Sequence, residues 1–379
     1  MKFLMVSSYL PSVLNFRGKL LERIHQQGYE IHIIAPDLSS FSDEHQKLLN
    51  LGYKVYNVPM QRTGTNPVAD LATLFALYRL ISHIKPDAIL SYTIKPVIYG
   101  TLAAWLAKVP HRFALITGLG YAFQNVDKNS KRSIFQKLVH SLYQQALSRC
   151  SKTFFQNPDD LALFRELKLL QSNIPAVVVN GSGVNVSDFN IMPLPLNNQN
   201  QVKISFLLIA RLLGDKGVRE FAAAAAIIKQ LNPEIEFNLV GWIDENPAAI
   251  TQQELDSWID QKIIKYWGKL SDVRPAIAAS SVYVLPSYRE GTPRTVLEAM
   301  AMGRAIITTD APGCRETVTP NKNGFLVEVK SVTSLAEAMQ KFIVQPELAI
   351  VMGECSREIA LTKYDVHQVN AHMMKEMGL

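Results

Sequence analysis

The sequence has few cysteines and no hydrophobic run long enough to span a membrane. Only three of its 379 residues are cysteines, and Cys150, Cys314 and Cys355 are widely separated. An odd number of scattered cysteines argues against a disulfide framework or a zinc site and is typical of a reducing compartment. No apolar run approaches the ~20 residues of a membrane span, and Pro11 interrupts the first apolar run too early for a secretory leader. We therefore expect a cytoplasmic protein.

Motifs for metal and nucleic-acid binding are also missing. Asp-x-Asp occurs nowhere, and the eight histidines show no spacing typical of metal ligands. No helix-turn-helix, zinc-finger or RNP-like pattern is present. We therefore expect no metal ion, no other cofactor and no nucleic-acid partner.

Positive charge is concentrated in the first half of the chain. Residues 1–185 contain 20 basic and 11 acidic side chains, whereas the remaining residues contain 19 and 22. Without a nucleic-acid motif, a basic half suggests attraction to an anionic membrane surface. Residues 130–149 combine apolar residues with basic ones, a pattern typical of a membrane-surface helix and equally of a packed helix with a solvated face. The basic residues of this segment are Lys131, Arg132, Lys137 and Arg149.

Strands and helices alternate along two segments of the chain. The alternation extends over residues 1–187, is absent from the Asn-, Pro- and Gln-rich residues 188–202 and continues over residues 203–364. A chain of this length is expected to form two domains. We predict an N-terminal domain, a linker and a C-terminal domain at these boundaries. Because alternating strands and helices are typical of a parallel, doubly wound sheet, the predicted fold class is α/β with two Rossmann-like domains.

Ligands of parallel sheets bind outside the carboxyl ends of the strands. In the first domain this rule selects Lys95, just after the expected strand 87–92, and Thr117, at the end of the next strand. The first strand is expected to lead through a loop at residues 9–17 to Gly18 and then a helix. Gly18 either forms part of a phosphate-facing turn or lets the helix pack closely on the sheet.

In the second domain, a strand at residues 203–210 is followed by Arg211, Lys216 and Gly217 and then by a helix. This spacing places the two cations on either side of a tight turn at a helix N-terminus. Two fixed cations and free helix N–H groups make a diphosphate clamp that needs no metal. The alternative is a purely structural turn.

A second stretch, Pro286–Met300, follows the apolar strand Val282–Leu285 and reads PSYREGTPRTVLEAM. Thr292 and Pro293 predict the cap and first turn of a helix. The free N–H groups at its start, including those of Arg294 and Thr295, favour a bound phosphate.

This stretch carries two glutamates, Glu290 and Glu298. Eight helical residues separate their backbones by roughly 12 Å, whereas glycosidase carboxyl pairs lie ~5 to ~10 Å apart. Carboxylates accept hydroxyl hydrogen bonds well, so we predict that Glu298 binds a ribose and Glu290 a hexose, with a diphosphate between them. The alternative is that Glu290 is a solvated loop charge and Glu298 pairs with Arg294 at i,i+4.

The sequences of these two stretches resemble the motifs of one enzyme family. Glu-Gly-x6-Glu-Ala after a strand and Pro-Ser, with Arg-x4-Lys-Gly at residues 211–217, resembles the signature of the retaining glycosyltransferases of family 4, which have the GT-B fold. The segments at residues 91–96 and 116–123 resemble the corresponding sequences of its bacterial polysaccharide and N-glycan branch. This branch includes α-1,3-N-acetylgalactosaminyltransferases acting on undecaprenyl-diphosphate-linked sugars. The resemblance covers essentially the whole chain.

The resemblance implies two Rossmann-like domains facing a cleft, with a C-terminal helix at about residues 365–379 crossing back onto the first domain. It implies that the N-terminal domain binds the acceptor through Lys95 and Thr117. Many family members have a histidine in the loop that contains Thr117 here. The C-terminal domain would bind a UDP-sugar. The catalytic residues implied are Arg211, Lys216 and Glu290. The donor-binding residues implied are Gly18, Leu270, Gly291, Thr292, Arg294, Thr295 and Glu298.

We predict from the resemblance that the protein transfers a hexose or N-acetylhexosamine, with N-acetylgalactosamine as the best candidate, from a UDP-sugar to a polyprenyl-diphosphate-linked saccharide. The transfer would retain the anomeric configuration, need no metal and occur at the inner face of the cytoplasmic membrane. A GT-B nucleotide-sugar epimerase would need further acid/base residues in the cleft. An inactive sugar-nucleotide-binding scaffold tends to lose part of the predicted catalytic set, and all of it is present here.

Overall fold

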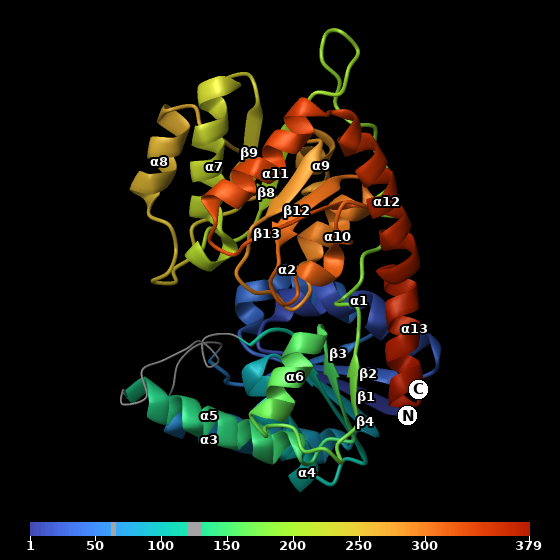
Figure 1. Ribbon diagram of the computed structural model, residues 1–379. Coiled ribbons are helices and arrows are strands. Elements are labelled where there is room, and N and C mark those ends of the chain that lie inside the picture. Colours follow the sequence, from blue (N-terminus) through green and yellow to red (C-terminus); the bar gives the residue numbers. More distant parts are fainter. Residues whose placement is uncertain (62–65, 120–130) are drawn as a thin grey trace. The chain divides into compact units, whose positions relative to one another are not determined.

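The chain folds into two compact units, which are drawn together in Figure 1. The computed structural model describes residues 1–61, 66–119 and 131–379, with the backbone alone for residues 131–135. The first unit consists of residues 1–182 and 369–379, and the second of residues 183–368. Each unit contains a parallel β-sheet with helices on both faces, so the predicted α/β class with two doubly wound domains is confirmed.

In the described part of the first unit, parallel strands form one sheet in the order β3-β2-β1-β4-β5-β6-β7. The inner strands, such as β1 and β4, are apolar runs whose side chains are buried under helices on both sides, as expected for a parallel sheet. β1 pairs with β2 and β4, so the strand order reverses direction beside β1. The strands are β1 (Lys2–Val6), β2 (Glu30–Ala35), β3 (Lys54–Asn57), β4 (Ala88–Tyr92), β5 (His111–Ile116), β6 (Lys152–Phe155) and β7 (Ala176–Val178).

Helices cover both faces of this sheet (Figure 1). One core contains buried residues of α1, α2 and α13, such as Leu20, Leu48 and Met373. The opposite face is covered by α3 to α6. The bounds are α1 (Leu10–Gln26), η1 (Leu38–Phe41), α2 (Ser42–Asn50), α3 (Pro67–Ile84), η2 (Pro96–Gly100), α4 (Thr101–Leu106), α5 (Lys131–Leu147), α6 (Pro158–Glu166) and α13 (Val366–Met377), whose residues from Val369 onward belong to this unit.

The predicted loop at residues 9–17 is wrong, because α1 already begins at Leu10. Pro11 occupies the first turn of the helix, where its fixed φ and missing N–H are tolerated. Leu10, Val13 and Leu20 then bury one helical face. Gly18 consequently lies inside α1 and not at a strand-to-helix turn.

In the second unit, parallel strands form a sheet in the order β10-β9-β8-β11-β12-β13. The strand order again reverses direction beside the first strand of the unit, since β8 pairs with both β9 and β11. The strands are β8 (Ser205–Ile209), β9 (Glu236–Val240), β10 (Lys265–Tyr266), β11 (Val282–Leu285), β12 (Ala305–Thr309) and β13 (Gly324–Val327).

The helices of the second unit are again divided between two faces. Buried residues of α7, α8 and α11 form one core, and those of α9, α10 and α12 contribute to the other. The bounds are η4 (Gly214–Lys216), α7 (Val218–Leu231), α8 (Gln252–Asp260), α9 (Arg274–Ala278), α10 (Arg294–Ala301), η5 (Arg315–Thr317), α11 (Val332–Val344) and α12 (Glu347–Lys363).

The boundary between the units differs from the predicted one. The first unit ends at Ser182, and residues 188–202, predicted to be a linker, belong to the second unit. The reason is a buried arginine, Arg304, whose guanidinium donates to the carbonyl oxygens of Met192 at 2.6 Å and Pro193 at 3.1 Å. The Asn-, Pro- and Gln-rich composition therefore marks an irregular segment that is fixed to the second unit.

Among the described residues, no helix has both the length and the hydropathy that a membrane crossing requires.

Candidate functional site

The sheet of the second unit brings two loops together that are far apart in sequence. In doubly wound sheets, ligands bind outside the carboxyl ends of the strands, at the point where the strand order reverses. Here that point lies between β8 and β11. β8 leads into the loop with Arg211 and Lys216, and β11 leads into the loop with Glu290. The strand order thus places the two predicted halves of the site beside each other.

Lys216 and Glu290 contact each other directly across these loops. The Lys216 Nζ lies 2.5 Å from the Glu290 Oε1, and the side chains are only 16% and 17% exposed. Burial opposes the charge of Lys216, but the adjacent Glu290 carboxylate outweighs it and raises the pKa of Lys216. Lys216 is therefore charged at neutral pH. The alternative that Glu290 is a solvated loop charge is wrong.

Ser287 also fixes the Glu290 carboxylate, through the same oxygen that contacts Lys216. The Ser287 Oγ lies 2.8 Å from the Glu290 Oε1 and 3.1 Å from the Asp215 carbonyl oxygen. The Tyr288 N–H also donates to the Asp215 carbonyl oxygen, at 2.9 Å. The Glu290 loop is thereby bound to the turn that carries Lys216.

Two glycines allow this close approach of backbones. Gly217 has a φ of 71°, and a Cβ there would lie 2.1 Å from the Pro286 carbonyl oxygen. Gly313 has a φ of 81°, and its Cβ would lie 2.1 Å from the Glu290 carbonyl oxygen. Any larger residue at either position would push the Lys216 turn or the Glu290 loop away.

Arg211 is held by a residue that the sequence analysis did not identify. Its Nη1 lies 3.0 Å from the Asp244 Oδ2, in the loop after β9. The Arg211 side chain is 40% exposed, so this pair is weaker than the Lys216–Glu290 pair. Nothing in the sequence placed Asp244 beside Arg211, because this contact depends on β8 and β9 being neighbours in the sheet.

The helix expected after Glu290 begins one residue later than predicted. Pro293 keeps an extended ψ of 109° and takes the N-cap position, so α10 starts at Arg294, and the half-buried Thr292 lies before the cap. The Thr295 hydroxyl is fixed by the Tyr283 hydroxyl at 2.6 Å. The start of α10 follows the Glu290 loop directly, and its first N–H groups lie where a phosphate is favoured. Gly291, between the two, is buried.

Glu298 pairs with Arg294 on α10, as the alternative interpretation expected. The Arg294 Nε lies 2.8 Å from the Glu298 Oε1, and the Glu298 side chain is 10% exposed. Burial raises the pKa of Glu298, and Arg294 opposes this shift. The predicted ribose contact of Glu298 stays a prediction, because the pair neither provides nor excludes it.

The loop after β10 contains Leu270, which the resemblance implied to bind the donor. The N–H of Gly241, which follows β9, donates to the Gly268 carbonyl oxygen at 2.9 Å, which fixes this loop to the neighbouring strand end. Leu270 is half-buried in the same loop. Its predicted contact with the donor stays a prediction.

The remaining predicted residues belong to the first unit. Lys95 is paired with Asp70 of α3 at 2.6 Å, and Tyr99 donates to the same carboxylate at 3.0 Å. Thr117 is half-buried at the end of β5. Gly120 and Tyr121, within the segment at residues 116–123, lie outside the described residues.

The reversal point of the first sheet, between β1 and β4, carries a strained residue. Thr93, just after β4, has a φ of 69°, which is unfavourable for a β-branched residue. Its hydroxyl lies 2.8 Å from the Ser8 hydroxyl, just after β1. Strain of this kind is often found at functional sites, and this position is where the rule for parallel sheets expects a ligand.

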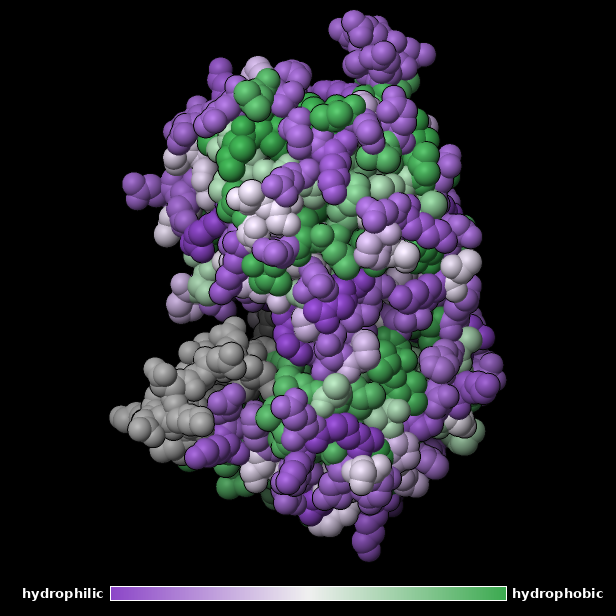
Figure 2. All heavy atoms as spheres, in the orientation of Figure 1, coloured by the Kyte–Doolittle hydropathy of each residue, from purple (hydrophilic) through white to green (hydrophobic). Residues whose placement is uncertain are grey.

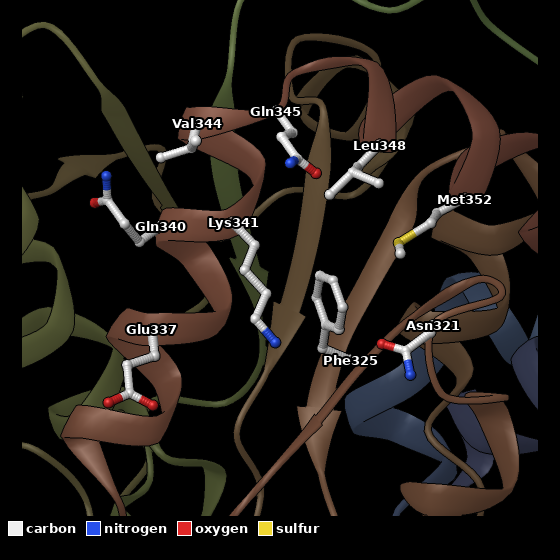
Figure 3. A pocket seen from close by; sticks show the side chains of 9 residues that line it. All are labelled: Asn321, Phe325, Glu337, Gln340, Lys341, Val344, Gln345, Leu348 and Met352. Carbon is white, nitrogen blue, oxygen red and sulfur yellow. The ribbon is translucent and has the colours of Figure 1, made fainter.

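An open groove of about 540 Å³ lies elsewhere in the second unit, between α11, the start of α12 and β13. Figure 2 shows hydrophobic residues on this face of the unit, and Figure 3 shows Lys341 extending towards Phe325, with the Nζ 4.5 Å from the ring centre. Phe325 lies near the amino end of β13, opposite the strand ends that carry Lys216 and Glu290. None of the predicted site residues lines this groove.

The second-unit cluster contains three cations, Arg211, Lys216 and Arg294, each paired with a carboxylate. Within the part of the chain that the structure describes, no three His, Cys, Asp or Glu side chains form a group that could hold a metal ion. Fixed cations beside a helix N-terminus can stabilise negative charge on a phosphate group. The chemistry that fits the cluster is binding, or departure, of a diphosphate.

Comparisons with known proteins agree with this arrangement. Residues 203–345 match the family described as glycosyl transferases group 1, and residues 12–157 match glycosyl transferase 4-like proteins. The chain is 30% identical over 377 residues to the N,N'-diacetylbacillosaminyl-diphospho-undecaprenol α-1,3-N-acetylgalactosaminyltransferase of Campylobacter jejuni, covering 96% of this chain and 95% of that protein. It is 26% identical to the UDP-Gal:α-D-GlcNAc-diphosphoundecaprenol α-1,3-galactosyltransferase of Escherichia coli, covering 89% and 86%.

The fold is similar to solved structures along the whole chain. Sucrose-phosphate synthase of Thermosynechococcus elongatus superimposes with a TM-score of 0.78 at 15% identity, covering 99% of this chain and 98% of that one. HepE of Anabaena, in complex with UDP, superimposes with a TM-score of 0.76 at 16% identity, covering both chains fully.

Proposed function

Since the chain belongs to the group 1, family 4-like glycosyltransferases of GT-B fold, we propose that it transfers a hexose or N-acetylhexosamine, with retention, from a UDP-sugar to a polyprenyl-diphosphate-linked saccharide. The observation that carries this proposal is the Lys216–Glu290 contact at the reversal point of the second sheet, beside the start of α10. N-acetylgalactosamine is the favoured sugar, because the Campylobacter jejuni relative is named for its transfer.

The donor would lie over the carboxyl ends of β8 and β11. Arg211, Lys216 and the first N–H groups of α10 would hold the diphosphate, because fixed positive charge is favoured there. Glu298 would accept hydrogen bonds from the ribose and Glu290 from the transferred sugar. The name of the Escherichia coli relative supports a UDP-sugar as donor, and both relatives' names support an undecaprenyl-diphosphate-linked sugar as acceptor.

The reaction breaks the bond between the sugar's anomeric carbon and the diphosphate oxygen, and forms one from that carbon to an acceptor hydroxyl oxygen. The bonding electrons leave with UDP, whose diphosphate becomes more negative. Lys216 and Arg211 stabilise this developing charge, and preorganised charge is most effective at such a point. The acceptor approaches from the side of the leaving group, so its proton passes to the departing phosphate oxygen.

The two alternatives fit the cluster less well. An inactive scaffold would not need the Lys216 ammonium and the Glu290 carboxylate within 2.5 Å of each other in a shielded position. An epimerase would need an acid/base pair at the sugar, whereas the acidic groups described in this cluster are bound by cations. Transfer is therefore the proposal that uses every charged group of the cluster.

A donor panel tests this proposal. The purified protein is incubated with UDP-activated hexoses and N-acetylhexosamines and with a short-chain prenyl-diphosphate-linked acceptor, and released UDP and product are measured. We expect UDP release that depends on acceptor, with the same anomeric configuration in product and donor. Interconversion of UDP-sugars without an acceptor would support an epimerase, and binding without turnover would support a scaffold.

A chelator tests whether a metal ion takes part. We expect turnover to survive EDTA, because Arg211 and Lys216 supply the positive charge that a divalent ion would otherwise provide at the diphosphate. The measurement is UDP release with EDTA and after adding Mg²⁺ or Mn²⁺. Complete inhibition that either ion reverses would contradict the proposed role of the two cations.

Such an acceptor is anchored in a membrane, so we further propose that the protein works attached to the inner face of the cytoplasmic membrane. The excess of basic over acidic residues in the first half of the chain supports attraction to anionic lipid. The acceptor would bind the first unit, near Lys95 and Thr117.

A further inference from the structure

Helix α3 of the first unit is apolar on both its buried and its exposed face. Its inner face, with Thr73, Leu77, Ile81 and Ile84, is buried against the sheet. A helix that is apolar all round is normally surrounded by apolar material. Among the described residues, only one side of α3 is covered. Four large side chains remain exposed on the other side, namely Val68 at 78%, Leu71 at 66%, Phe75 at 60% and Tyr78 at 38%.

These four residues, which we call the α3 stripe, lie on one helical face. Their spacing of three, four and three residues places them above one another along the axis. The stripe extends over about 15 Å, since each residue rises ~1.5 Å. Single exposed apolar residues are normal on a protein surface, whereas a continuous row marks an interaction site.

The charges of α3 show what kind of surface the stripe fits. Asp70 is the only acidic residue of the helix, and it is turned inward, where it pairs with Lys95. Arg79 is exposed beside the stripe, with its guanidinium 6.0 Å from the centre of the Phe75 ring. The exposed His83 and Lys85 follow at the end of the helix. Along the helix, the exposed face is therefore first apolar and then, towards the C-terminal end, cationic, and it carries no acidic group.

We propose that the α3 stripe is the surface by which the protein attaches to an anionic lipid bilayer. Leu71 and Phe75 enter the boundary between headgroups and acyl chains, Tyr78 lies at the headgroups and Arg79 contacts lipid phosphate. This proposal rests on the proposed function, because a membrane-anchored acceptor gives the enzyme a reason to bind lipid. It differs from the sequence prediction, which assigned lipid contact to residues 130–149.

Helix α5, which contains most of those residues, is less suited to this contact. Among its described side chains, the exposed positions are Lys137, Leu138, Ser141 and Gln145, which are mostly polar. The side chains of Lys131 and Arg132 lie outside the described residues. Lys137 nevertheless provides a direct test of the α5 alternative.

The experiment is co-sedimentation of the full chain with vesicles. One vesicle preparation contains phosphatidylglycerol and phosphatidylethanolamine, and the other contains phosphatidylcholine alone. For the wild-type protein we expect binding to the anionic vesicles that weakens at high salt. Leu71→Ser/Phe75→Ser should lower the partition coefficient by about tenfold or more, because two partly inserted apolar side chains are lost. Arg79→Glu should lower it several-fold, chiefly at low salt.

Matched variants separate lipid contact from general effects. Leu231→Ser/Val344→Ser removes two similarly exposed apolar side chains, at 83% and 68%, from the second unit and should leave vesicle binding unchanged. Lys47→Glu reverses an exposed charge on α2 of the first unit and should have a smaller effect than Arg79→Glu. Because the substituted α3 residues are exposed, thermal unfolding of the variants should match that of the wild type.

Three outcomes would overturn the proposal. The first is that Leu71→Ser/Phe75→Ser binds vesicles as the wild type does. The second is that only Lys137→Glu weakens binding, which would assign the contact to α5. The third is that the double variant changes the oligomeric state, measured by light scattering, and not vesicle binding, which would make the stripe an interface between copies of this chain.

The proposed function is tested separately, with an acceptor analogue that has a short, water-soluble prenyl chain. The α3 double variant should transfer sugar to this analogue at the wild-type rate, because α3 binds the bilayer and not the reacting groups. In the wild-type protein, transfer to the analogue without any vesicle binding would overturn the α3 proposal alone. Vesicle binding without transfer from any UDP-sugar would overturn the proposed function and leave the membrane contact in place.

Discussion

Replacing Lys216 with alanine should reduce kcat by about 10²–10³-fold, with little change in the KM for the acceptor. Loss of one preorganised charge where negative charge develops commonly has an effect of this size. The effect should fall on kcat because the diphosphate becomes more negative as the sugar leaves, so Lys216 stabilises the transition state more than the bound donor. The measurement is steady-state UDP release with the donor and the acceptor varied in turn.

Two further variants make this result interpretable. Lys216→Gln can still donate a hydrogen bond to Glu290 but has no charge, so it should stay folded and lose the same activity. Lys341→Ala removes an exposed lysine from the groove of the same unit and should keep wild-type turnover. Near-wild-type turnover in Lys216→Ala would exclude Lys216 from the site.

Replacing Arg304 with alanine should lower the free energy of unfolding of the second unit by at least about 3 kcal/mol. The Arg304 side chain is buried, and its guanidinium donates to five carbonyl oxygens. These belong to Ile277, Met302 and Ala278 in addition to Met192 and Pro193. Burial lowers the pKa of Arg304 to about 10, so the group is still charged at neutral pH. Alanine would leave several buried carbonyl groups without a donor.

Urea unfolding followed by tryptophan fluorescence measures this effect, since Trp242, Trp258 and Trp267 all belong to the second unit. The control is Arg315→Ala, which removes an arginine paired with Asp310 at the surface and should cost less than about 1 kcal/mol. An unchanged unfolding midpoint in Arg304→Ala would contradict the structural role of Arg304. Arg304→Lys should be intermediate, because one ammonium group cannot reach all five oxygens.

Much of the fold was predictable because it depends on local patterns. Short β-branched apolar runs such as Val282–Leu285 became strands within one or two residues of the predicted bounds. Asn157 caps α6 through the Asp160 N–H, and an asparagine directly before a proline is a local signal for the start of a helix. The start of α1 was missed because residues 9–17 were interpreted as a loop, although proline is tolerated in the first turn of a helix.

Part of the candidate site was also predictable, because parallel sheets bind ligands at the carboxyl ends of their strands. Arg211, Lys216 and Glu290 could be selected from their positions after strands without knowing the strand order. Ser287 and Asp244 could not, because their roles depend on which loops become neighbours. Two interpretations of Glu298 were possible from the sequence, a ribose contact and a pair with Arg294, and the structure contains the Arg294 pair.

The sequence by itself therefore determined the alternation of strands and helices, the two-domain α/β class and the membership of Lys216 and Glu290 in loops that face one sheet edge. Only the tertiary structure decided that these two residues touch, since they are 74 positions apart and meet because β8 pairs with β11. The tertiary structure also decided that Arg304 fixes residues 188–202 to the second unit and that one apolar face of α3 is exposed. The physical reason is that hydrophobic periodicity and capping act over a few residues, whereas ion pairs and burial depend on which distant segments the fold brings together.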